Sequence, residues 1–177
     1  IKPIDAIAID EVVAAANVAK GSFFNHFTDK QAFADAIATE VRLEVEQQVT
    51  LANTHVADPV ERIARGMCVG AEFALHHPKR TTVLFRSHAN STARAHPLNK
   101  GLVADVEAAC ALGLLRQEAK ETGVLYWLGL CQILMTNLIE RQLPQAAYEQ
   151  RLNDMLALGL AGLGVASEDC QKIMERL

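Results

Sequence analysis

Residues 9–30 constrain the fold more than any other part of the sequence, because two short helical patterns follow one another there across a turn. An apolar stripe runs along the first helix and consists of Ile9, Val12, Val13 and Ala16. Their spacing of i, i+3, i+4 and i+7 places all four on one helical face. Asn17 follows, and asparagine is second only to glycine in accepting the left-handed conformation that ends a helix sharply. We therefore predict a turn at residues 17–19.

The second predicted helix has an aromatic face and a polar face. Phe23 and Phe27 lie one turn apart and, with Val18, can anchor this helix to the first one. The side chains on the outward face are Lys20, Ser22, Phe24, Asn25 and His26. Most of these are hydrogen-bond formers that can reach base edges and phosphates. The pattern predicts a helix-turn-helix whose second helix recognises DNA.

The order of residues here is specific: an apolar residue before Asp10-Glu11, Val18 after the turn, the run KGSFFNHF from Lys20, and then Asp29-Lys30. It resembles the N-terminal domain of the TetR family of bacterial transcriptional regulators over about the first thirty residues. The resemblance implies DNA contacts at Ala19, Lys20, Ser22, Phe24, Asn25, His26 and Lys30. The lysines would contact phosphates, and the polar side chains would bind bases or phosphates. The alternatives are solvated surface charge for the lysines and helix capping for Asn25 and His26.

Three features depart from the family pattern. Members usually carry a complete first helix with a basic lead-in, so about one helix of the domain is missing from this sequence. Phe24 stands where the family usually has a tyrosine whose hydroxyl touches a phosphate, and Ala8 stands where a serine or threonine usually caps the helix. Each of the last two removes a polar group from the DNA-binding domain. Asn17 in place of the usual glycine is a milder change.

The charge of the chain argues against strong electrostatic attraction to DNA. The 177 residues carry a net charge of −4, and residues 1–52 hold 4 Lys/Arg against 8 Asp/Glu. DNA-binding proteins gain affinity by neutralising phosphates with basic side chains. The acidic first part therefore keeps a second hypothesis open: a helical homodimer that binds a ligand or a protein without specific DNA binding.

The rest of the chain predicts an all-α fold in which half of the residues are hydrophobic. Asp29 can cap a long helix that ends near residue 52, and Asp58-Pro59 with Glu61 begins another that ends near His77. Further helices are predicted at residues 79–87, 97–112, 117–142 and 144–163 and from residue 167. We divide the chain into a DNA-binding domain at 1–30, a connecting helix at 31–52, and a ligand-binding and dimerisation domain at 53–177.

The predicted helices at 117–142 and 144–163 are rich in leucine and are interrupted by small residues. These residues are Gly129, Gly159, Gly162 and Gly164. Small residues let helices approach closely, so we predict that both helices form a four-helix bundle with a second copy of the chain. The alternative is an ordinary intramolecular core. A dimer would pair two recognition helices on a palindromic double-stranded operator.

Helical bundles hold small molecules between helices lined by apolar side chains. The candidates for a ligand site are Met67, Phe73, Phe85, His88, Tyr126, Trp127 and Met135, each of which could instead be plain core. The resemblance likewise implies a small-molecule inducer. The ligand would act through the long helix from Asp29, by favouring one spacing of the recognition helices. The chain is thus predicted to be a ligand-responsive homodimeric regulator, a repressor released by its inducer.

Other chemistries find little support in the sequence. The four cysteines (Cys68, Cys110, Cys131 and Cys170) show no metal-ligand spacing, so we expect reduced thiols in a cytoplasmic protein and neither a metal site nor a cofactor. No catalytic motif occurs, and an enzyme is not predicted. A metal-assisted enzyme using the histidines at 76–96 (His76, His77, His88 and His96) ranks last. The apolar stretch at 123–139 contains polar residues and is read as a buried helix, not a membrane span.

Overall fold

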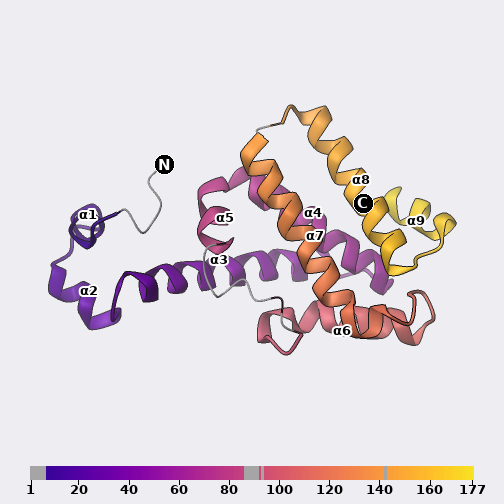
Figure 1. Ribbon diagram of the computed structural model, residues 1–177, viewed down its shortest axis with the longest axis horizontal. Coiled ribbons are helices and arrows are strands. Elements are labelled where there is room, and N and C mark those ends of the chain that lie inside the picture. The colour runs from indigo at the N-terminus through magenta and orange to yellow at the C-terminus, as the bar shows by residue number, and fades with distance from the viewer. Residues whose placement is uncertain (1–6, 86–91, 93, 142) are drawn as a thin grey trace.

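The computed structural model of this chain describes residues 7–85, 92, 94–141 and 143–177. All regular structure within those ranges is helical, which confirms the predicted all-α fold. The elements are α1 (Ile9–Ala15), α2 (Lys20–His26), α3 (Lys30–Ala52), α4 (Pro59–His76), α5 (Pro78–Phe85), the 3-10 turn η2 (Pro97–Asn99), α6 (Lys100–Ala111), α7 (Ala119–Arg141), α8 (Gln145–Leu163) and α9 (Ser167–Met174). Figure 1 shows α1 and α2 at one end of the long helix α3, with the later helices gathered around its other part.

A left-handed residue joins α1 to α2. Asn17 has a φ of 54°, the one positive value at a non-glycine residue in the described ranges. The amide of Val18 donates to the carbonyl of Val13 at 3.0 Å, and the amide of Asn17 donates to that of Ala14 at 3.1 Å. This pair of hydrogen bonds is the usual closure of a helix that ends in a left-handed residue, so the predicted turn is confirmed.

Three phenylalanine rings hold α2 against α3. Phe23 is buried, and its ring centroid lies 5.4 Å from that of Phe27 and 5.5 Å from that of Phe33. Tilted ring contacts at such distances are favourable beyond the area that they bury. The sequence predicts that Phe23 and Phe27 anchor α2 to α1, whereas the ring contacts run to Phe33 of α3. The same role predicted for Val18 is wrong, because the turn leaves its side chain 48% exposed, and Phe33 of α3 supplies the contact instead.

Two helices begin with the aspartate caps that the sequence predicts. Asp29 accepts a hydrogen bond from the Ala32 amide at 2.8 Å, and Asp58 accepts one from the Val60 amide at 2.9 Å. The helix predicted from residue 97 begins differently, as the 3-10 turn Pro97–Asn99, and α6 itself starts at Lys100.

The body is built around α4, which packs against α3, α6, α7 and α8. The largest fully buried side chains include Ile63 and Met67 of α4, Trp127, Leu134 and Leu138 of α7, and Leu156 and Leu160 of α8. By length and composition alone, α7 is apolar enough to cross a membrane. Its three largest buried side chains belong to this core, while only 33% of its most apolar window is buried, so α7 is a partly buried helix and not the fully buried one that the sequence predicts.

Candidate functional site

The outward face of α2 presents the side chains that the sequence predicts for DNA recognition. Lys20, Ser22, Phe24, Asn25 and His26 are all exposed. The Phe24 ring is 50% exposed and meets Phe23 edge-on at 5.4 Å, so the position offers an apolar face where a tyrosine hydroxyl would stand. DNA contact by these residues remains a prediction.

The two lysines of the predicted DNA-binding set already have partners within the domain. Lys20 pairs with Asp10 at 2.8 Å, and both side chains are more than half exposed. An exposed pair of this kind is weak, so Lys20 is able to exchange Asp10 for a phosphate. Lys30 is half-buried and donates to the Ile7 carbonyl at 3.0 Å, which ties the chain ahead of α1 to the start of α3.

Ala8 lies at the N-cap of α1, where it provides no side-chain cap. The Glu11 carboxylate compensates in part, because it accepts the Ala8 amide at 3.4 Å. The next residue of the predicted set, Ala19, is the N-cap of α2 and likewise provides no side-chain cap. Its carbonyl accepts the Ser22 amide at 2.9 Å.

A cavity of about 530 Å³ lies in the body between α3, α4, α6 and α7. Three of the predicted ligand-site residues line it, namely Phe85, Trp127 and Met135. Met67 and Phe73 are buried in the core and do not line the cavity. Tyr126 is on the outer face of α7 and 37% exposed, with its hydroxyl 3.5 Å from the Leu158 carbonyl. His88 lies outside the described residues.

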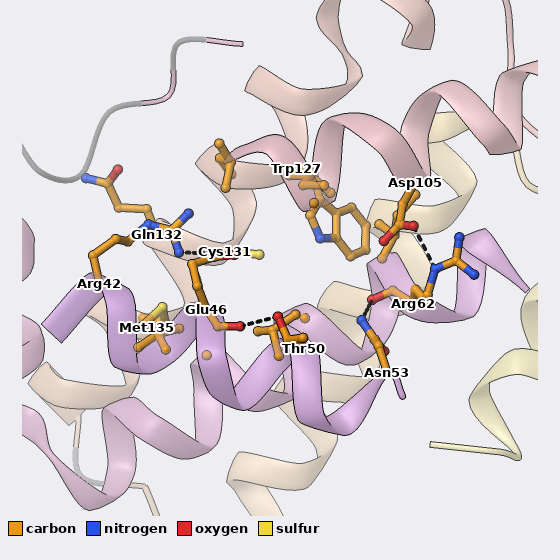
Figure 2. A pocket seen from close by; sticks show the side chains of 18 of the residues that line it. Arg42, Glu46, Thr50, Asn53, Arg62, Asp105, Trp127, Cys131, Gln132 and Met135 are labelled. Carbon is orange, nitrogen blue, oxygen red and sulfur yellow. Dashed lines mark hydrogen bonds and ion pairs between the residues drawn. The ribbon is translucent and has the colours of Figure 1, made fainter. Parts of the chain in front are cut away.

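Two ion pairs that the sequence did not predict also line this cavity. Arg42 and Glu46 of α3 pair with each other, one helical turn apart. Arg62 of α4 pairs with Asp105 of α6 at 2.7 Å between Nε and Oδ1. Figure 2 shows Trp127 between these two polar groups. The sequence signal that could have revealed the first pair is the position of Arg42 and Glu46 beside the valines of α3. Those valines mark the helix face that packs against the body.

Burial changes the protonation of several cavity groups. Desolvation raises the pKa of Glu46 even though Arg42 opposes the shift, and it raises the pKa of Asp105 even though Arg62 does the same. Burial also raises the pKa of Cys131, a further lining residue, to about 12. This thiol is therefore protonated at neutral pH and is a poor nucleophile.

The histidines of the 76–96 region are used separately wherever the structure describes them. His76 Nδ1 lies 2.9 Å from the Glu72 carbonyl, the His77 ring lies 4.8 Å from that of Phe73, and the His96 ring accepts the Leu98 amide at 3.3 Å. The described residues contain no group of three or more His, Cys, Asp or Glu side chains arranged to hold a metal ion. The geometry thus brings together no catalytic histidine cluster in the described ranges.

Comparison with known proteins agrees with the two-part organisation. Residues 2–37 match the model of the family described as bacterial regulatory proteins, tetR family. The fold is similar to the crystal structure of RolR without ligand, with 20% sequence identity, a TM-score of 0.59, and coverage of 98% of this chain and 89% of that chain. It is also similar to RolR in complex with resorcinol, with 18% identity, a TM-score of 0.64, and coverage of 98% and 85%.

No curated protein matches the chain in sequence, and identities near one fifth show the fold alone. The family model carries the assignment, because it covers the helix-turn-helix formed by α1 and α2 together with the start of α3. TetR proteins regulate transcription and are not enzymes. Residues 2–37 therefore form a DNA-binding domain of the TetR family type.

Proposed function

We propose that the chain is a homodimeric repressor that binds a palindromic double-stranded DNA operator and is released from it by a small-molecule inducer. One observation carries the proposal: α3 both lines the 530 Å³ cavity and begins at the recognition helix. A ligand that favours one arrangement of α3 thereby changes the spacing of two recognition helices, which must lie roughly 34–36 Å apart to enter successive major grooves. The protein would act in the cytoplasm, where its free cysteines stay reduced.

In this proposal residues 1–30 bind DNA, residues 31–52 form the helix that connects the two domains, and residues 53–177 bind the inducer and form the dimer. The outer faces of α7 and α8 support the dimer assignment because they carry exposed apolar side chains. These are Leu125, Tyr126 and Ile133 of α7 and Leu158 of α8. Exposed apolar patches on helices mark interaction surfaces, and two helices from each copy would complete a four-helix bundle.

The inducer is a small molecule with an apolar body. The cavity volume falls within the range of about 300–1,000 Å³ that is usual for ligand sites. Phe85, Trp127 and Met135 supply aromatic and sulfur-containing walls. RolR, which shares the fold, has been crystallised with resorcinol, and this supports an aromatic inducer.

The decisive experiment selects DNA from a random pool and then measures fluorescence anisotropy on the enriched sequence at two salt concentrations. An enriched palindrome that binds far more tightly than scrambled DNA would support the proposal and supply the operator for an inducer screen. A folded dimer that enriches no sequence would contradict it. That outcome would favour a ligand-binding homodimer without DNA specificity, which the acidic first 52 residues, Phe24 and Ala8 already support.

A further inference from the structure

The arginines of the cavity are already occupied by protein acceptors. Arg42 donates to Glu46, to Asn99 Oδ1 at 3.0 Å and to the Leu98 carbonyl at 3.3 Å. Arg62 donates to Asp105 Oδ1 at 2.7 Å, and to two backbone carbonyls, those of Val56 at 3.0 Å and Ala57 at 2.9 Å. Each guanidinium group is therefore held by a carboxylate and by further protein acceptors, although Arg42 Nε and Arg62 Nη2 donate to no acceptor in the described part of the chain.

The carboxylates of the same two ion pairs are less completely satisfied. Glu46 uses Oε1 toward Arg42, and Asp105 uses Oδ1 toward Arg62. The second oxygen of each, Oε2 and Oδ2, accepts no hydrogen bond from the described part of the chain. A carboxylate offers about four acceptor sites, and taking it out of water is costly unless those sites are used. The Glu46 and Asp105 side chains are largely but not fully buried, at 28% and 16% exposed. The raised pKa values of both groups agree with this, since desolvation outweighs the arginine in each case.

The two carboxylates stand apart with an apolar surface between them. Glu46 comes from α3 and Asp105 from α6, and Figure 2 shows them on either side of the Trp127 indole. Val49, Ile63 and Leu128 add to the apolar lining. The charges of the two arginines and the two carboxylates cancel, so the cavity has no net attraction for an ion of either sign.

We propose that the inducer is a neutral aromatic compound that carries hydroxyl groups at opposite ends, one donating to Glu46 and the other to Asp105, with its ring against Trp127. The inference rests on the proposed function, because it names the ligand class of the same cavity. It uses the two carboxylate oxygens that accept no hydrogen bond from the described residues. An anionic aromatic ligand would place its charge against two carboxylates.

Binding can be followed without DNA, because Trp127 is the single tryptophan of the chain and lines the cavity. Quenching of its emission, checked by isothermal titration calorimetry, would be measured with three matched pairs of one-ring and two-ring probes. The diols are resorcinol and 4,4′-dihydroxybiphenyl, the donor-free controls are their dimethyl ethers, and the anionic controls are isophthalate and biphenyl-4,4′-dicarboxylate. At least one diol should bind roughly tenfold or more tightly than its ether, the factor expected for hydrogen bonds to a charged acceptor.

Two variants test the acceptors. Glu46→Gln and Asp105→Asn should each weaken binding of the preferred diol by roughly tenfold. Glu40→Gln on the exposed face of α3 and Glu107→Gln on α6 are matched controls that should leave affinity unchanged. Thermal melts would establish that each variant folds. If a variant fails to fold, the inference is tested by the comparison of diol with ether on the unmodified protein.

The inference is overturned if the ethers bind as tightly as the diols, if the dicarboxylates bind best, or if no diol binds. Operator binding with no response to diols would reject this ligand class and leave the proposed function standing. Diol binding by a dimer that selects no operator would support this ligand class and reject the proposed function.

Discussion

Gly159 of α8 lies so close to Trp127 that a Cβ atom at residue 159 would come within 2.8 Å of the indole Cζ3. Trp127 is 1% exposed and also lines the cavity, so its ring has little room to move away from α8. The absence of a side chain at Gly159 therefore sets the position of one cavity wall. It also links the proposed dimerisation helix to the proposed ligand site through a single ring.

Substituting Gly159→Ala should lower the free energy of unfolding by about 1–3 kcal/mol, the usual cost of overpacking a core. Leu130 Cδ1 would lie 3.1 Å from the added atom, so the buried Trp127 and the partly buried Leu130 would both have to shift. Urea unfolding at fixed protein concentration would measure the loss. Gly101→Ala on α6 is the matched control, since nothing lies within 4 Å of its Cβ position. An equal loss in both variants would show that close approach to Trp127 is not the cause.

Local signals explain why most helices could be predicted. A capping aspartate and a following proline act within a few residues, and the residues around Asp58 and Asn17 accordingly form the cap and the turn that the sequence indicates. The cavity polar groups could not be found in this way. Arg62 and Asp105 are 43 residues apart and meet only after α4 has packed against α6. The exposure of Val18 was missed for the same kind of reason, because the ring that packs on Phe23 comes from the next helix.

The left-handed turn makes residue 17 sensitive to the shape of its side chain. Asn17→Gly should leave stability unchanged or slightly higher, because glycine takes positive φ without steric cost. Asn17→Val should lower the stability of the α1–α2 unit by about 1–2 kcal/mol, since the branched Cβ crowds the carbonyl at φ 54°. Amide hydrogen exchange of α1 and α2 would report the change where it occurs. Similar protection in the two variants would contradict the requirement for this conformation.

Asp10 should restrain DNA binding by competing for Lys20. The two side chains are 2.8 Å apart, and removing the carboxylate frees the ammonium group and removes one negative charge from the proposed DNA-binding face. Asp10→Asn should therefore raise affinity for operator and for scrambled DNA alike, more at low salt than at high salt. Lys20→Ala should weaken binding to both and flatten the salt dependence.

Asn25→Ala should instead reduce discrimination between operator and scrambled DNA. If Asn25→Ala weakened both equally, Asn25 would not read sequence.

The contact between α3 and α5 should depend on pH through Glu44. Arg80 donates to both carboxylate oxygens of Glu44, at 3.1 and 2.5 Å. Chiefly through this hydrogen bonding, with its charge and that of His77 adding to the effect, the pKa of Glu44 is held below its usual value of 4.5. A depressed pKa means that the pair stabilises the fold fully above pH 4.5 and loses that effect as pH falls through the lower folded value.

Glu44→Gln should accordingly destabilise the protein at pH 7 and differ little from the unmodified chain near the acid limit of folding. Both side chains are more than a third exposed, so the difference at pH 7 will be small and will shrink with added salt. Thermal melts of both proteins from pH 7 downward test this. Glu40→Gln, on the same helix, should show no such pH-dependent difference. A gap that widened on acidification would have the wrong sign and would reject this account.

The proposed dimer places Leu158 of α8 at the subunit interface, although the side chain is 69% exposed in the single chain. Leu158→Glu would bury a charge against the partner and should shift the protein to monomer in analytical ultracentrifugation. It should also abolish tight operator binding, because both half-sites must be engaged together. Leu112→Glu is the matched control, since Leu112 is 66% exposed just after α6 and outside the proposed interface. Dissociation by Leu112→Glu but not by Leu158→Glu would move the interface away from α7 and α8.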